Sequence, residues 1–544
     1  MDRDQQFLMP PDMREWLPAD HPVWLVIAAV GQLDTSAVHA HRRTGGVGRA
    51  GYHPDMLLTL LMWAWAQGVR SSRRIERACA HDIAFRVICA GDVPDHVTIS
   101  RFRAETAASM ESVFEQVLIL CAKLGMARLG VVALDGVKIG SNASMSANRT
   151  EEGLVKAGQD ERDRQAAAAA AARAAAREAA AEHAAADAAD DDLFGPDDRG
   201  DQVPPDAVDP SSREIRIAAA LADLQAEKDA ERAAAKAKGD AYLARRERGH
   251  TVPGSRPPPG VDVQIARDRL ARVIAEREEF IADYWRRRRA AEAAGTRNWA
   301  RLPRPVEQHQ AVIRCRAQLA KAEARQAKRD AAQTRSRRVR NTTDPQSRMM
   351  PLRGGGWLQG YNCQAVTSAD GLIIAVSVNN NPSDMITYIP MTDAAVKAAE
   401  LIDQHRPAGT GTGIGIMVAD AGYLSADNLT APGPDRLIAV GKAYAVELDA
   451  RTNPAQGSPP DTTDPVEAMG HRLRTPEGIA TYRQRSHIAE TPFGHGKHNL
   501  GFRRFTSRGL IRTTAEWNFH GAVHNIFKAI STGHLTPAGH PVTG

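Results

Sequence analysis

The stretch VVALDGVKIGSNAS, residues 131–144, decides the fold of this chain. Four apolar residues run up to a lone carboxylate, Asp135, and Gly136 follows it directly. This order is typical of a buried strand that ends at a site, where a glycine lets the chain turn or a phosphate come close. Such a charge is costly to desolvate unless a metal, a cation or hydrogen-bond donors meet it. We therefore expect either a site around Asp135 or a carboxylate that only caps the following turn.

The composition indicates a chain of several domains with a mildly basic charge. At 544 residues, the chain is expected to hold about two to four domains. Lysine and arginine exceed aspartate and glutamate by 70 to 65, a net charge of +5, which permits a polyanionic partner without demanding one. Five scattered cysteines without a C-x-x-C pair predict no disulfide framework and no zinc knot. A reducing cytoplasm fits this pattern. The polar start of the chain predicts neither a signal peptide nor a membrane span.

Residues 10–125 predict a compact helical region. Residues 56–68 are apolar nearly all round and end at a glycine, which is typical of a buried helix with a C-capping glycine. Ser71 or Ser72 is expected to cap a second helix, which carries three arginines on its polar side.

A short basic helix follows a turn and a cap within residues 94–103, and it carries Arg101 and Arg103. Short helices joined by tight turns resemble a helix-turn-helix motif whose recognition helix enters a major groove. An ordinary helical subdomain with a solvated basic face fits the same pattern.

The composition changes abruptly across residues 150–340. Residues 165–189 are mostly alanine, which has high helix propensity but little to pack, and residues 190–210 predict a loop or disorder. Helix-patterned segments follow at 211–248, 261–294 and about 306–338, and the proline-rich linker 251–259 separates the first two. We expect antiparallel helices that form an arm with a solvated charged face. A nucleic-acid contact at the basic end of the arm, from Arg335 to Arg340, is the alternative.

Strand patterns return after the arm. Residues 361–378 predict a hairpin with Asp-Gly at its turn, and a helix is expected from Asp384 to His405. Residues 414–423 repeat the opening theme, because an apolar strand delivers Asp420 into a glycine turn. A short helix from Ser425 and another apolar piece, 436–440, complete a mixed α/β sheet in which the arm is inserted after the first edge strand.

Basic and acidic groups gather in the last informative stretch, 482–509. If residues 481–490 are helical, Arg483, His487 and Glu490 project from neighbouring turns, and Tyr482, Arg485 and Ala489 lie on the adjacent face. The basic groups could hold a phosphate while the acid holds a metal. We do not expect His487, His495 or His498 to be metal ligands, because histidines in a basic stretch are more often hydrogen-bonded or DNA-facing.

These residues carry a resemblance to a known family. Asp135, Asp420 and Glu490 resemble the DDE triad, and Tyr482, Arg485, Glu490 and Lys497 resemble the Y-R-E-K signature, of insertion-sequence transposases with a ribonuclease-H-like core. Residues 52–79 and 94–103 are similar to the helical domain of the same families. The resemblance covers residues 20–150 and 340–530 and does not reach the alanine-rich arm. The family signature places three residues between its Arg and Glu, whereas this chain has four.

The resemblance implies an α/β fold: a ribonuclease-H-like mixed sheet core, an all-α N-terminal domain and a long helical insertion. The expected parts are a helical DNA-binding domain (1–125), the first part of the core (126–150), the insertion with disordered linkers (151–340), the remainder of the core (341–530) and a flexible tail (531–544).

The resemblance also implies a chemistry. Two Mg²⁺ or Mn²⁺ ions about 3.5 to 4 Å apart can activate water and relieve the charge on a reacting phosphate, and magnesium prefers oxygen ligands. Asp135 would bridge the ions, and Asp420 and Glu490 would each complete one side. Strand cleavage at the element ends would be followed by attack of a freed 3′-hydroxyl on target DNA. The expected DNA-binding residues are Arg101, Arg103, Tyr482, Arg485, Lys497, Arg503, Arg504 and Arg508.

The expected partner is double-stranded DNA, as inverted repeats and as target. A homo-oligomer on that DNA, no membrane, and a bacterial cytoplasm with nucleoid association are further expectations. Two other functions stay open. A non-transposing nuclease of the same fold would use the same acids for hydrolysis alone, and a catalytically silent derivative would only bind DNA.

Overall fold

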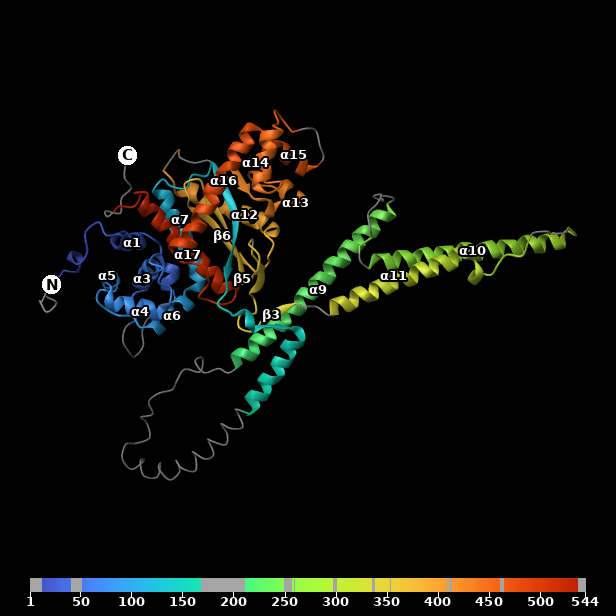
Figure 1. Ribbon diagram of the computed structural model, residues 1–544, viewed down its shortest axis with the longest axis horizontal. Coiled ribbons are helices and arrows are strands. Elements are labelled where there is room, and N and C mark those ends of the chain that lie inside the picture. Colours follow the sequence, from blue (N-terminus) through green and yellow to red (C-terminus); the bar gives the residue numbers. More distant parts are fainter. Residues whose placement is uncertain are drawn as a thin grey trace, which may run out of the picture. The chain divides into compact units, whose positions relative to one another are not determined.

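The computed structural model describes residues 12–40, 51–167, 211–248, 257–258, 260–296, 301–334, 338–352, 354–407, 409, 413–459 and 464–536. The chain forms two compact units, one from residues 1–147 and 343–544 and the other from residues 148–342. Strands and shorter helices make up most of the first unit, and long helices make up most of the second (Figure 1). None of the described helices is long and apolar enough to cross a membrane.

A mixed sheet lies at the centre of the first unit. Its strands are β1 (Val131–Gly140), β4 (Arg348–Pro351), β5 (Trp357–Ser368), β6 (Ile373–Asn379), β7 (Ile416–Ala419) and β8 (Asp435–Ile438). Strand β1 pairs antiparallel with β5 and parallel with β7, and β8 is parallel to β7. On the other edge of β5, β4 pairs with its first residues and β6 with the rest. The expected mixed α/β sheet is confirmed, and the Asp-Gly turn of the β5–β6 hairpin has Gly371 at φ +85°.

Two expectations about β1 are wrong. The strand was expected at an edge, but it lies between β5 and β7 in the middle of the sheet, because both of its edges form backbone hydrogen bonds with a neighbouring strand. It was also expected to end at Asp135, but it continues to Gly140. Gly136 is therefore a point of close approach and not a turn: a Cβ there would lie 2.6 Å from Nε2 of Gln364 and 2.9 Å from Oδ1 of Asp384.

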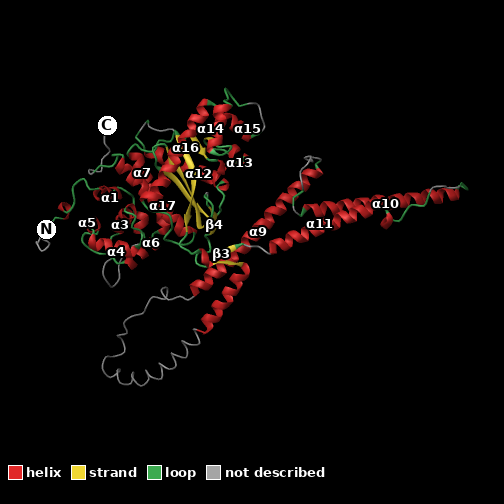
Figure 2. Cartoon of the chain, viewed as in Figure 1, coloured by secondary structure: helices red, strands yellow, loops and turns green. Residues whose placement is uncertain are grey.

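Helices surround this sheet (Figure 2). They are α1 (Pro22–Val30), α2 (Ser36–His39), α3 (Pro54–Ala66), α4 (Ser72–His81), α5 (Ile83–Ile88), α6 (His96–Glu105), α7 (Met110–Lys123), α12 (Tyr388–His405), α13 (Ala426–Thr430), α14 (Ala443–Thr452), α15 (Pro465–Arg474), α16 (Pro476–Gly494) and α17 (Leu510–Ser531). Helices α12 and α17 pack against β6 and α7, and α16 packs against β1, β5 and β7.

The helical N-terminal region does not form a compact unit of its own. Helix α17, from the C-terminal part of the chain, packs on α1, α3 and α7. One apolar core runs through these helices and the sheet, and it includes Leu58, Val117, Leu134 and Trp517. The apolar helices of this region are covered by α17, which lies nearly 400 residues later in the chain. The expected boundary at residue 125 therefore does not separate two compact structural units.

Local signals in the N-terminal region predicted its helices well. Helix α3 is followed by Gly68 at φ +68°, as a C-terminal glycine requires. Ser71 is the N-cap residue of α4, although its side chain makes no capping bond. Asp95 caps α6 by accepting hydrogen bonds from the backbone N–H groups of Val97 and Thr98 at 2.9 and 2.8 Å.

Long helices dominate the second unit, as the sequence predicted. A helix over 151–167 is followed by α9 (Ser211–Glu247), α10 (Val261–Ala293) and α11 (Gln310–Thr334), and β2 (Asn148–Thr150) pairs with β3 (Val339–Asn341). Helices α10 and α11 are antiparallel, since Arg329 pairs with Asp262 at 2.9 Å and Arg267 with Glu323 at 3.0 Å. The alanine-rich segment beyond residue 167, the break at 190–210, most of the linker 251–259 and the tail beyond 536 lie outside the described residues.

The basic end of the arm differs from expectation. The last helix was expected to reach about residue 338; its described part runs to Thr334, and Arg338 is not helical. Arg338 pairs with Glu231 at 2.6 Å, and Arg340, only 3% exposed, pairs with Asp223 at 2.7 Å and also with Glu227. Carboxylates of α9 thus form ion pairs with Arg338 and Arg340, which weakens the alternative of a nucleic-acid contact by these arginines. Arg335 and Arg337 lie outside the described residues.

Replacement of Gly360 by alanine is expected to destabilise the first unit by about 1 to 3 kcal/mol. A Cβ at Gly360 would lie 2.2 Å from the carbonyl oxygen of Ile139 on the paired strand, so β1 and β5 would have to separate locally. Urea unfolding followed by the fluorescence of buried tryptophans measures the change. Gly441→Ala is the control, because nothing lies within 4 Å of a Cβ there. Equal unfolding midpoints for the two variants would contradict the expectation.

Candidate active site

Strand β1 holds Asp135 on the face of the sheet that α16 covers. Side chains alternate along a strand, and Ala133, two residues earlier, packs against Tyr482 of α16 within one apolar cluster. Asp135 is 9% exposed. Its Oδ1 accepts a hydrogen bond from the backbone N–H of Gly136 at 2.8 Å, and its Oδ2 lies 3.4 Å from Nη1 of Arg485. The carboxylate is thus met by donors and a cation, as the cost of its burial demands.

The neighbouring strand presents Asp420. Strand β7 ends at Ala419, and Asp420 caps the following 3₁₀ turn by accepting a hydrogen bond from the backbone N–H of Gly422 at 2.8 Å. The predicted strand that delivers a carboxylate into a glycine turn is confirmed. Because β7 is parallel to β1, Asp420 lies beside the middle of β1, close to Asp135.

The buried and exposed sides of helix α16 are those that the sequence predicted. Tyr482, Arg485 and Ala489 are buried, whereas Arg483, His487 and Glu490 are exposed. The side chain of Glu490 is 64% exposed, and its Oε1 lies 3.8 Å from Nη2 of Arg485. One guanidinium therefore contacts carboxylates on β1 and on α16.

The buried cation Arg485 is the centre of the arrangement. Burial lowers its pKa, but Asp135, Tyr482 and Asp420 together outweigh that effect and raise it above its usual value. Asp135 and Glu490 both contact this arginine, and the charge of Asp420 acts on it as well. Among the described residues, however, the three acids are not a trio whose metal-binding atoms all lie within 4.8 Å. The carboxylate oxygens are donors of the kind that Mg²⁺ and Mn²⁺ take, so the donor set fits these ions, while the guanidinium lies between its members.

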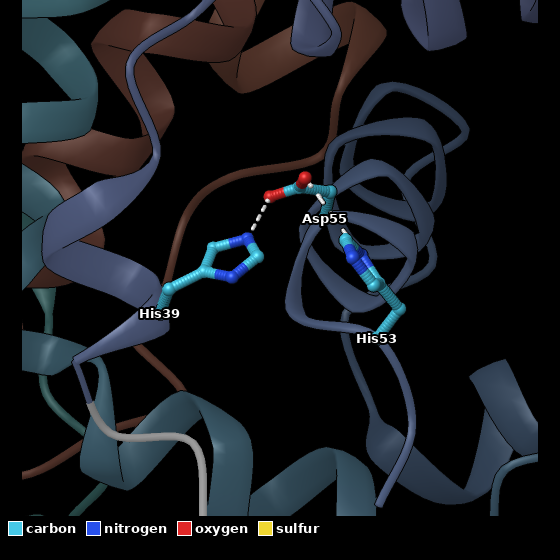
Figure 3. A group of neighbouring side chains, drawn as sticks. All are labelled: His39, His53 and Asp55. Atoms are coloured by element: carbon cyan, nitrogen blue, oxygen red, sulfur yellow. Dashed lines mark hydrogen bonds and ion pairs between the residues drawn. The ribbon is translucent and has the colours of Figure 1, made fainter. Parts of the chain in front are cut away.

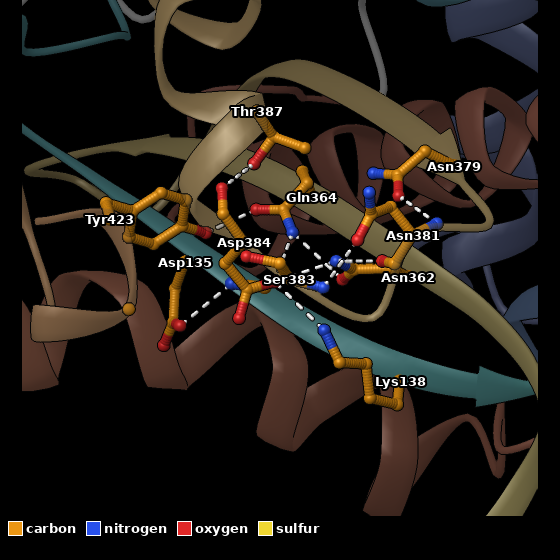
Figure 4. A network of polar contacts seen from close by, with 12 residues as sticks. Asp135, Lys138, Asn362, Gln364, Asn379, Asn381, Ser383, Asp384, Thr387 and Tyr423 are labelled. Carbon is orange, nitrogen blue, oxygen red and sulfur yellow. Dashed lines mark hydrogen bonds and ion pairs between the residues drawn. The ribbon is translucent and has the colours of Figure 1, made fainter. Parts of the chain in front are cut away.

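Asp384, predicted from the sequence only as the start of a helix, is a further acid near these residues. It lies on the sheet face opposite Asp135, because it contacts Gly136 and Lys138, which alternate with Asp135 along β1. Its Oδ1 accepts hydrogen bonds from Nζ of Lys138 at 2.9 Å and from the side-chain amides of Asn362 and Gln364 at 2.8 Å each (Figure 4). The carboxylate also lies beside Gly422, since its Oδ2 is 3.6 Å from the position of a Cβ there. The polar residues within β5, which a buried strand would otherwise avoid, were the signal that could have revealed this network.

Tyr423 connects the acids to that network. Its hydroxyl donates a hydrogen bond to Oε1 of Gln364. Burial raises the pKa of this phenol well above its usual value, and the charges of Asp384, Asp135 and Asp420 raise it further. The phenol therefore stays protonated and remains a donor.

The expected DNA-binding residues fall into two groups. Arg101, Arg503, Arg504 and Arg508 are exposed, and Lys497 is half-buried beside Val137 and Ile139 of β1. Tyr482 is only 4% exposed and Arg485 only 7%, so these two side chains present little surface to a ligand. Arg103 donates hydrogen bonds to the carbonyl of Arg70 at 2.9 Å and to Oγ1 of Thr506 at 2.5 Å, and its guanidinium is likewise engaged within the protein.

A different trio has the spacing of metal ligands. In the described part of the chain, atoms of His39, His53 and Asp55 lie within 4.8 Å of one another (Figure 3). Nε2 of His39 lies 2.8 Å from Oδ1 of Asp55, and Nδ1 of His53 lies 3.7 Å from Oδ2. Burial alone would raise the pKa of Asp55, but hydrogen bonds from Thr35 and His39 lower it below its usual value. The hydrogen bond between His39 and Asp55 connects two members of this trio. His487, His495 and His498 do not belong to this trio.

Two family models match the chain. Residues 11–105 match a transposase domain (DUF772), and residues 455–530 match a transposase DDE domain. No curated protein and no solved structure matches the chain significantly. The first match covers helices α1 to α6, and the second covers α15, α16 and α17, which include Arg485 and Glu490. Both matches support a transposase, and the second supports one of the DDE type.

Proposed function

We propose that this chain is a DDE transposase that cleaves DNA strands at the ends of a mobile element and joins them to target DNA. The observation that carries the proposal is the convergence of Asp135 from β1 and Glu490 from α16 on one buried arginine, with Asp420 from β7 beside them. Carboxylates are costly to gather in a partly buried place, and sites that gather them are often catalytic.

The proposed core is ribonuclease-H-like. Its support is the central strand β1, which has antiparallel neighbours on one side and parallel neighbours on the other, and which carries an acid in its middle. The helical region that precedes β1 and the arm inserted after it accord with the proposed N-terminal DNA-binding part and insertion. A homo-oligomer on DNA in a bacterial cytoplasm belongs to the same proposal.

Asp135, Asp420 and Glu490 would hold two Mg²⁺ or Mn²⁺ ions. Bound there, such ions supply a water-derived nucleophile at neutral pH and neutralise charge on the reacting phosphate. The protein's own part is to fix the acids on a rigid sheet and helix, to keep Tyr423 as a neutral donor, and to hold DNA with exposed cations. Lys497 would bind a phosphate near the cut, and Arg101, Arg503, Arg504 and Arg508 would extend that contact.

A strand-transfer assay tests the proposal. The full chain is mixed with precleaved DNA ends that carry the inverted repeats flanking its gene, a supercoiled plasmid and Mg²⁺ or Mn²⁺. We expect joined products that open the plasmid, and none when the 3′-hydroxyl of the ends is replaced by hydrogen. Hydrolysis of uncleaved ends without any joining would instead identify a nuclease. Binding of the ends with neither reaction would identify a silent DNA-binding derivative.

A further inference from the structure

We call Asp135, Asp420 and Glu490 the acid cluster. A cavity of about 810 Å³ lies outside this cluster, where the turn before α4 and helix α6 face the segment that leads into α17. Six arginines line it: Arg70, Arg74, Arg103, Arg504, Arg508 and Arg512. We call this cavity the arginine cleft. Arg70, Arg74, Arg103 and Arg512 have no role in the proposed function so far.

The cleft has one acidic residue, and that carboxylate is already engaged. Glu516 is 6% exposed and accepts hydrogen bonds from the backbone N–H groups of Thr506 at 2.9 Å and Ser507 at 3.0 Å. Six cations therefore face one occupied anion. A concave surface lined by one sign of charge attracts polyanions.

The guanidinium of Arg70 is held close to aromatic rings and to other arginines of the cleft. Its guanidinium lies over the rings of Trp65 and Phe502, at 5.7 and 5.1 Å from their centroids, and donates a hydrogen bond to the carbonyl of Gly501 at 2.5 Å. Its Nη1 is buried without a hydrogen-bond partner. Burial lowers its pKa most. The charge of Glu516 offsets part of that effect, and the neighbouring cations Arg103 and Arg74 lower the pKa further. An arginine held rigidly under such repulsion is favoured where an anion binds.

The outer arginines keep donors available at the surface. Arg74, Arg504, Arg508 and Arg512 are exposed. Within the described residues, Arg504 and Arg508 each donate one hydrogen bond to a backbone carbonyl, at 3.3 Å to Ala143 and 2.9 Å to Asn142. A guanidinium has five N–H donors, so most of theirs remain for a ligand. Ser71, Ser72 and Ser100 also line the cleft and add neutral donors, which commonly accompany arginine at phosphates.

The cleft is tied to the strand that carries Asp135. The backbone N–H of Gly140 donates to the carbonyl of Arg503 at 3.1 Å, and the N–H of Phe505 donates to the carbonyl of Gly140 at 2.8 Å. At about 3.3 Å per residue, the five residues from Asp135 to Gly140 span about 17 Å. That length corresponds to about five base pairs of DNA at about 3.4 Å each.

We propose that the arginine cleft binds the phosphate backbone of duplex DNA a few base pairs from the cleavage site. The inference rests on the proposed function for the identity of the polyanion, and it adds where the duplex is held and by which residues. The contacts are to phosphates and not to base edges, so they position the DNA without reading its sequence.

Salt-dependent binding of the full chain tests the cleft. Arg74→Gln and Arg512→Gln are combined in one variant, since both side chains are exposed and their loss should leave the fold intact. Fluorescence anisotropy gives the Kd for a duplex with the flanking repeat and for a random duplex over a range of salt concentrations. We expect the slope of log Kd against log salt to fall by about two, about 0.9 per lost contact, and affinity at low salt to weaken at least tenfold on both duplexes.

Matched controls make the result decisive. The double variant Arg128→Gln, Arg451→Gln removes two exposed arginines elsewhere on the same unit and should leave the slope unchanged. An unchanged slope for the cleft variant, or an equal fall for both double variants, would contradict DNA binding by the arginine cleft.

The proposed DNA binding by the cleft and the proposed enzymatic function can fail separately. If the chain joins ends but the cleft variant keeps its slope, only the cleft is wrong. If the chain never joins or cleaves DNA but the slope falls, only the enzymatic function is wrong.

Discussion

Replacement of Glu490 by glutamine is expected to lower the rate of DNA strand cleavage by about 10³-fold or more while changing duplex binding by less than about twofold. Glutamine keeps the shape of the side chain but removes the charge that would hold a divalent ion. Loss of even an indirect contact to a metal ligand typically costs about 10- to 100-fold, so loss of a ligand should cost more. The side chain is 64% exposed, so the fold should not depend on it.

Cleavage of a labelled end with anisotropy on the same duplex measures both quantities. Asp420→Asn should behave alike, since Asp420 is the acid at the end of β7. Glu447→Gln is the control, because Glu447 pairs with Arg483 on the outer side of α16 at 2.7 Å and lies outside the acid cluster. Full cleavage by Glu490→Gln would remove Glu490 from the catalytic site, and loss of DNA binding together with cleavage would instead show a structural role.

Much of this arrangement could be predicted because its signals are local. Apolar residues 416–419 followed by Asp420 and Gly422 specify a strand and a turn within a few positions. The helical spacing of Tyr482, Arg485 and Ala489 likewise fixes one buried face of α16. Residues three or four apart share a face of any helix, so the sequence alone separates the buried arginine from the exposed Glu490.

Other features could not be predicted because they depend on pairing between distant parts of the chain. The position of β1 in the middle of the sheet follows from its pairing with β5, more than 200 residues later. The burial of Arg103 depends on Thr506, 403 residues away. Asp384 looks like the ordinary start of a helix in the sequence, and only the approach of Lys138 and Gln364 gives its carboxylate the partners of a polar network.

The proposed chemistry would depend on how Arg485 responds to a bound metal ion. The guanidinium and a divalent cation both require Asp135, and their like charges repel at short range. In the metal-free protein, the arginine keeps the buried carboxylate paired. A bound ion would take over that role, so Arg485 would act as a temporary counter-ion that stabilises the site before the metal and the DNA arrive.

Replacement of Arg485 by methionine is therefore expected to destabilise the metal-free protein by about 3 to 5 kcal/mol, the usual cost of removing one partner from a buried ion pair. The arginine is 7% exposed and Asp135 9%, so water compensates little. Urea unfolding measures the loss, and Arg483→Met, on the exposed side of the same helix, should change stability far less. Adding Asp135→Asn to the Arg485→Met variant should cost less than it does in the unmodified chain, because the carboxylate has already lost its cation.

The same variant shows whether the guanidinium and the metal compete. A ligand that binds only the folded state stabilises it according to its concentration relative to its Kd. Without the repelling guanidinium, Mn²⁺ should bind more tightly, so a fixed Mn²⁺ concentration should raise the unfolding midpoint of Arg485→Met more than that of the unmodified chain. Equal midpoint shifts would mean that the arginine and the ion do not share Asp135. A larger shift in the unmodified chain would mean that Arg485 helps to build the metal site instead of occupying it.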